Sequence, residues 1–153
     1  VPVYRQFKIL RENSWVVLIS CLAGMISGLV TIIGLALILM MSEITTLSTL
    51  ARSITMAIAL DTTELIGGVA GIIVAGVIFA GIFGTVVSGL IFRIFRIEEP
   101  IAKGLALGAA SHAMGTAESL KASELQGAMS SLAMVVSGVV MVGLIPLAAL
   151  FVQ

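Results

Sequence analysis

The residues of this sequence best suited to chemistry gather in one short polar segment. Ser111, His112, Gly115 and Thr116 follow the apolar run 101–110, and His112 is the only histidine of the chain. An imidazole titrates near neutral pH, so it can pair with an anion or carry a proton. The hydroxyl groups can donate hydrogen bonds, and glycine permits a left-handed turn or the close approach of a ligand. The segment therefore predicts a site for a small anion.

A second polar segment follows the apolar run 47–60. Asp61 and Glu64 are three positions apart, so both carboxylates can face one side of a turn and hold a proton or a cation. The alternative is a segment near the membrane surface whose carboxylates are simply solvated. Thr55 and Thr63 can donate hydrogen bonds to a bound carboxylate, or they can cap broken helix ends.

The sequence contains no recognisable catalytic or metal-binding motif. Cys21 is the only cysteine, so neither an internal disulfide nor a thiolate metal site can form. One histidine cannot make a zinc site, and neither a glycine-rich phosphate loop nor a Ser-His-Asp order is present. We therefore expect no enzymatic activity, no metal and no cofactor.

The composition places the chain in a membrane. Hydrophobic residues make up 59% and charged residues 10%, whereas charged residues alone reach roughly 25% in soluble domains. Mean hydropathy is +1.23. The 8 basic and 8 acidic residues cancel and form no basic stripe, which argues against a nucleic-acid partner. An ionisable side chain at membrane depth is costly and usually marks a ligand or ion pathway, so transport is the first hypothesis and packing alone is the alternative for His112.

Hydrophobic length predicts the fold. Residues 14–42, 65–92 and 125–153 are each long enough to span, because a transmembrane helix needs about 20 apolar residues. The apolar runs 47–60 and 101–110 are too short to cross alone. We expect an all-α polytopic membrane protein with three spanning helices and two broken, re-entrant helical hairpins.

The hairpins can be placed by length. A straight helix over residues 65–95 would be about 46 Å long, whereas the hydrocarbon core is about 30 Å thick. Part of this segment must therefore lie outside the helix that crosses the membrane. We expect residues 61–64 to form the tip of the first hairpin and residues 65–72 its return limb. The second hairpin has an entering limb, a tip and a return limb at residues 101–110, 111–116 and 117–124.

The two hairpins resemble an internal repeat. Aligning Ala51 with Ala102 places Asp61 on His112. Hairpins that enter from opposite faces would form the inverted repeat found in many secondary transporters. The positive-inside rule then puts one set of basic residues on the cytoplasmic side: Arg5, Lys8, Arg11, Arg93, Arg96 and Lys103.

Several glycines are spaced four residues apart, a pattern that lets two helix backbones approach closely. We expect close helix packing at three such pairs: Gly24 with Gly28, Gly67 with Gly71, and Gly104 with Gly108.

Residues 102–117 read AKGLALGAASHAMGTA and residues 126–133 read QGAMSSLA. Both closely resemble the signature of the LrgB/CidB family, and residues 2–6 and 52–68 resemble its upstream segments. The match corresponds to the C-terminal two thirds of a typical member, so we expect residues 1–153 to be a single transmembrane domain without the family's first helices. One departure is Met56-Ala57, where members commonly carry Thr-Pro.

The resemblance implies two functions. Bacterial members are described as antiholin-like or holin-like proteins that modulate murein hydrolase activity and lysis with a small LrgA/CidA-type partner. Similar proteins are described as pyruvate transporters and plastidial glycolate/glycerate translocators. We expect a carrier of small monocarboxylates in the inner cell membrane, with basic flanks in the cytoplasm. The antiholin-like regulator is the alternative, and association of several copies stays open.

Overall fold

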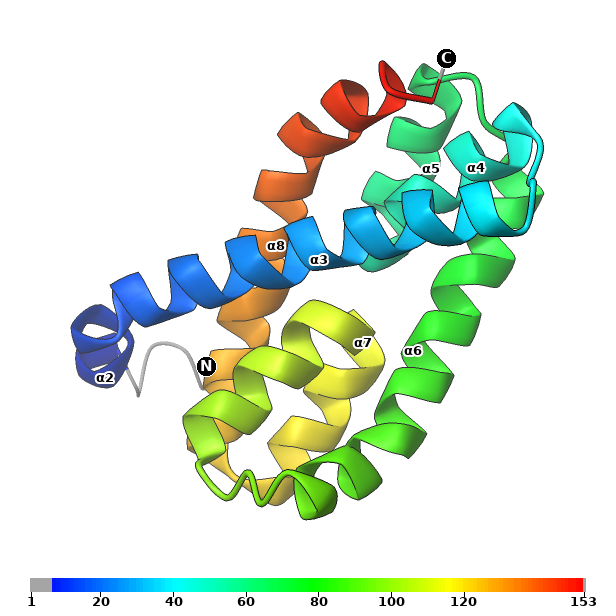
Figure 1. The fold of residues 1–153 in the computed structure, drawn as a ribbon. Coiled ribbons are helices and arrows are strands. Elements are labelled where there is room, and N and C mark those ends of the chain that lie inside the picture. Colours follow the sequence, from blue (N-terminus) through cyan, green and yellow to red (C-terminus); the bar gives the residue numbers. More distant parts are fainter. Residues whose placement is uncertain (1–6, 153) are drawn as a thin grey trace.

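The structure is a computed structural model that describes residues 7–152 (Figure 1). Within this range every regular element is a helix, and three helices are long and apolar enough to cross a membrane: α3 (Ser14–Ile38), α6 (Ala70–Ile94) and α8 (Glu124–Ala149). A short helix, α2 (Phe7–Glu12), precedes α3. Arg5, used above for orientation, lies outside the described residues. The prediction of an all-α polytopic membrane protein with three spanning helices is confirmed.

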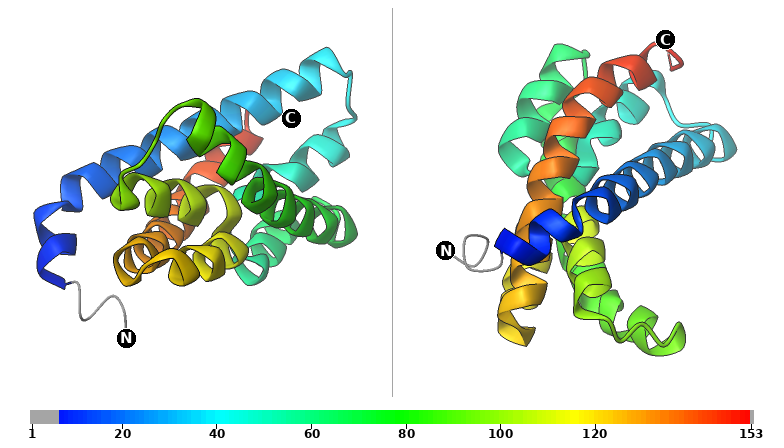
Figure 2. Two further views of the ribbon diagram at one scale, coloured as in Figure 1. Left: turned by 90° about the horizontal axis from the view of Figure 1, so that it is seen from below. Right: turned by 90° about the vertical axis from the view of Figure 1, so that its left-hand side faces the viewer.

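Two re-entrant hairpins separate the spanning helices. The first consists of α4 (Glu43–Leu50), the short 3₁₀ helix η1 (Ala51–Ser53) and α5 (Met56–Leu65). The second is α7 (Pro100–Ala122), whose backbone is broken at His112. Their outer ends lie at opposite ends of the molecule, and Figure 2 gives two further views of this arrangement. The predicted pair of hairpins is therefore present.

The first hairpin turns earlier than predicted. Its break lies at Ile54 and Thr55, which have extended backbones with φ/ψ of −141°/175° and −64°/146°. Asp61 and Glu64 are exposed in the last turns of α5, so a tip at residues 61–64 and a return limb at 65–72 are wrong. The physical reason is the cost of placing carboxylates at membrane depth. The helix carries them back to the outer end of the hairpin instead.

The inverted repeat is visible in the helix ends. Helices α3 and α6 are each 25 residues long and their bounds differ by 56 positions (14 to 70 and 38 to 94). Met40 and Arg96, separated by the same interval, both have a positive φ, of 49° and 53°. The amide after each of them closes the helix end by donating to a carbonyl five residues back, at 2.9 Å in both cases.

The predicted alignment of Asp61 with His112 is wrong, because the structural counterpart of the break at His112 is the break at Ile54. Ser53 precedes the first break and Ser111 precedes the second. The sequence alignment matched similar entering limbs, whereas the two breaks in the backbone define the equivalent positions.

Close packing between α7 and α8 depends on glycine. A Cβ at Gly104 would collide with the backbone of Gln126, and one at Gly108 would collide with the backbone of Ser130. The predicted close approach at this pair is confirmed. Nothing similar occurs at the other two pairs: Gly24 and Gly71 have no atom within 4 Å of an added Cβ, Gly28 has only the Ser53 hydroxyl at 3.8 Å, and Gly67 forms a turn with φ 82°.

We expect Gly108→Ala to destabilise the protein by about 1–3 kcal/mol, because the new methyl group forces α7 away from α8. Gly34→Ala is the matched control, since nothing lies within 4 Å of its added Cβ. Thermal unfolding of the purified variants in a mild detergent measures the difference. Equal stability of the two variants would contradict the tight α7–α8 contact.

Cysteine labelling tests the hairpins. In a Cys21→Ala background, Glu43→Cys and Leu65→Cys should react with a membrane-impermeant maleimide from the same side, because both residues lie at the outer end of the first hairpin and are exposed. Glu98→Cys and Lys121→Cys should react from the opposite side. Labelling of Glu43→Cys and Leu65→Cys from different sides would mean that the segment crosses the membrane.

Candidate functional site

The two hairpin tips meet at His112. Its backbone has φ 46° and ψ −119°, a conformation that interrupts α7, and its side chain is only 4% exposed. The imidazole lies against the backbone of Ser53, the last residue of η1. Within the described residues, its Nε2 has no hydrogen-bond partner. The break in one hairpin is thus held against the break in the other.

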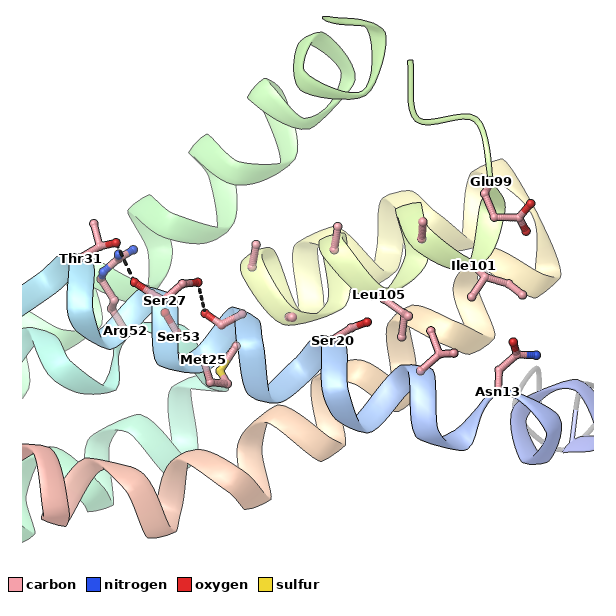
Figure 3. A pocket seen from close by; sticks show the side chains of 17 residues that line it. Asn13, Ser20, Met25, Ser27, Thr31, Arg52, Ser53, Glu99, Ile101 and Leu105 are labelled. Atoms are coloured by element: carbon pink, nitrogen blue, oxygen red, sulfur yellow. Dashed lines mark hydrogen bonds between the residues drawn. The ribbon is translucent and has the colours of Figure 1, made fainter. Parts of the chain in front are cut away.

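A cavity of about 850 Å³ lies beside this contact, between α3, η1 and the first limb of α7 (Figure 3). This size is within the range of small-molecule sites. The walls are mostly small or apolar, including Gly24, Gly28, Ala106 and Ala109. Its polar side chains are Asn13, Ser20, Ser27, Thr31, Arg52, Ser53 and Glu99.

The cavity reaches the middle of the hydrophobic layer. Arg52 lies about nine residues after Glu43, the first residue of α4, which corresponds to about 14 Å of helix or roughly half of a 30 Å hydrocarbon core. Ser27, on the opposite wall, lies near the centre of α3. Since irregular backbone at this depth is tolerated only where it is buried or lines a cavity, the breaks and the cavity belong together.

The second hairpin's predicted residues are buried behind the cavity wall. Ser111 is 2% exposed, and its Oγ lies where a Cβ on Gly84 of α6 would be. Thr116 Oγ1 shares a 2.9 Å hydrogen bond with Ser130 Oγ of α8. A Cβ on Gly115 would collide with the carbonyl of Leu107, so this glycine allows the two limbs of α7 to touch. Contact of these residues with a substrate stays a prediction.

The first hairpin's predicted residues are spread out. Thr55 lies at the break, where its side chain makes no capping hydrogen bond, and it lines a second cavity of about 300 Å³ against α8. Thr63 is buried near Ser48 and Gly68 at the outer end of the hairpin. The structure therefore brings Thr55 to the tips but leaves Thr63, like Asp61 and Glu64, away from them.

Arg52 is the residue that the sequence reasoning missed. It is half-buried, and its side chain extends into the cavity beside Ser27 and Thr31 (Figure 3). A signal was available in the sequence, because Arg52 is a lone basic residue inside an apolar run too short to span. The alignment of Ala51 with Ala102 includes Arg52 but assigns it no role.

Comparison with known proteins identifies the family. The LrgB-like family matches residues 1–151. The chain belongs to this family. Similar proteins include those called antiholin-like protein LrgB in Bacillus mycoides, 37% identical over 147 residues, and in Bacillus cereus and Bacillus anthracis, both 36% identical. Each alignment covers 96% of this chain and 64% of the relative. No solved structure matches the chain.

The Met56-Ala57 pair, where the resemblance leads us to expect Thr-Pro, falls at the start of a helix. Met56 and Ala57 are the first residues of α5. Proline is well tolerated in the first turn of a helix, where its missing N–H is not needed. The break at Ile54 and Thr55 is present in this LrgB-like protein without a proline.

The backbone of His112 predicts an unusual response to glycine. His112→Gly should be more stable than His112→Ala by about 1 kcal/mol, because only glycine adopts this φ/ψ without strain. Both variants lose the ring, so their difference isolates the backbone term. Ala117→Gly, inside the second limb, is the control and should lower stability relative to wild type. Thermal unfolding in detergent provides the measurement; a less stable His112→Gly would contradict the strained turn.

Proposed function

We propose that this LrgB-like chain forms the core of a secondary carrier for small monocarboxylates of the pyruvate, glycolate, glycerate and lactate class. The observation that carries the proposal is the meeting of two oppositely directed hairpin breaks beside an 850 Å³ cavity. Secondary carriers bind substrates between broken helices near the bilayer midplane, where the two repeats can rock against each other.

The helix ends at the tips support an anionic cargo. Helix α5 begins at Met56, and the second limb of α7 begins after His112. The first N–H groups of a helix have no partner within it and carry a partial positive charge, which suits a carboxylate. Thr55, Ser111, Gly115 and Thr116 are the residues we propose to shape or support this region.

His112 is our candidate for proton coupling. It is buried at the junction of the hairpins, and its Nε2 has no partner within the described residues. A proton gained there would place a charge at the contact between the two moving parts, which links protonation to their relative position. Asp61 and Glu64 stay predictions as ion-coupling residues, since they lie exposed at an outer end.

Reconstitution tests the carrier. Liposomes containing the protein should take up labelled pyruvate, glycolate or lactate saturably, and a proton gradient should change the rate. His112→Ala should abolish the pH dependence, while Glu118→Ala, on an exposed face, should leave uptake unchanged. Absence of saturable flux, alone and with an LrgA/CidA-type partner, would contradict the carrier. A His112→Ala variant with an unaltered pH profile would assign His112 a packing role.

A second candidate function rests on the names of the relatives, which are called antiholin-like. In this reading the protein regulates murein hydrolase activity and lysis through helix contacts with a holin-like LrgA/CidA-type partner. Broken hairpins beside a cavity serve no evident purpose in such a role. Co-purification with the partner, and murein hydrolase activity in cells with and without the protein, would test it. In both cases we propose an inner-membrane protein with its basic end in the cytoplasm.

A further inference from the structure

We propose that Arg52 binds the carboxylate of the substrate, and that its single positive charge makes the cavity selective for monocarboxylates over dicarboxylates. This inference rests on the proposed carrier function, because it names the residue that holds the cargo. It stands on three separate observations: the distribution of charge, the hydrogen bonds of the cavity wall, and the position of Glu99.

Arg52 is the charged residue that lies deep in the fold. The other basic residues of the described range lie in α2, in or near the α6–α7 connection, or on the exposed face of the return limb of α7: Lys8, Arg11, Arg93, Arg96, Lys103 and Lys121. Within that range, Lys121 and Glu118 form an ion pair on the surface, at 3.0 Å, whereas Arg52 forms no ion pair. A guanidinium without a counter-charge at membrane depth is costly, and a bound anion would supply that charge.

The neighbouring hydroxyl groups leave the donor role to Arg52. Ser27 Oγ donates to the carbonyl of Gly24 at 2.9 Å, and Thr31 Oγ1 donates to the carbonyl of Ser27 at 2.7 Å. Their protons are therefore used within α3. The planar guanidinium offers paired N–H groups that match a carboxylate in two parallel hydrogen bonds.

The other ionisable residue of the cavity disfavours a second negative charge. Glu99 is exposed and lies at the opposite end of the cavity from Arg52 (Figure 3). Between them the wall consists largely of small and apolar residues, including Leu105, Ala106 and Ala109. The second carboxylate of a dicarboxylate would meet apolar surface or a like charge. A monocarboxylate instead places its short neutral part there.

Binding of pyruvate to the protein in nanodiscs tests the inference. Pyruvate should raise the unfolding temperature saturably, and malonate should do so much more weakly. Arg52→Gln should weaken pyruvate binding about 30-fold or more, as for the loss of one partner of a buried charge pair. Arg52→Lys, which keeps the charge without the planar fork, should fall between. Arg93→Gln, at an exposed helix end, is the matched control and should bind like wild type.

A chemical test does not depend on how the variants fold. Phenylglyoxal should modify Arg52 of the wild-type protein, and pyruvate should protect this residue but not Arg93, as read by mass spectrometry. Arg52→Gln that binds pyruvate like wild type, pyruvate that gives no protection, or malonate that binds as well as pyruvate would overturn the inference.

Flux separates this inference from the proposed function. Arg52-dependent binding without transport would remove the carrier and keep the binding site. Transport by Arg52→Gln with an unchanged KM would keep the carrier function and remove Arg52 as the binding residue. A wild-type protein that neither binds nor transports pyruvate would overturn both.

Discussion

The contact between His112 and the backbone of Ser53 is the constraint around which the structure is arranged. A helix broken inside a bilayer exposes backbone groups that lipid cannot satisfy, so each break needs protein or a cavity around it. In this LrgB-like protein the two breaks satisfy that need together, because each lies against the other. The cavity follows from the same geometry, since two bent hairpins do not fill the space beside α3 as straight helices would.

Glycine allows the second hairpin to hold its place. Helix α7 lies so close to α8 at Gly104 and Gly108 that the backbone of α8 occupies the space of a side chain. This packing fixes the second hairpin to a spanning helix. By contrast, α6 has only Ile73 and Gly81 fully buried, and about half of its residues are exposed.

The two repeats follow the same plan, a spanning helix followed by a hairpin. Two spanning helices of equal length end in the same left-handed turn, and each is followed by a hairpin that returns to the end from which it entered. The hairpins point toward each other because they enter from opposite ends (Figure 1). A carrier can use this plan, since a small rotation of one half against the other would open the junction to one side and close it to the other.

The sequence by itself determined the parts that depend on local hydrophobicity: the three spanning helices, the two segments too short to cross, and the break at His112. These are fixed by length against bilayer thickness and by the residues at one site. Tertiary structure decided where the first hairpin turns, that Ser53 meets His112, and that Arg52 rather than Thr63 or Asp61 faces the cavity. The reason is that a turn at membrane depth forms where its backbone finds partners, and those partners lie on elements far away in the sequence.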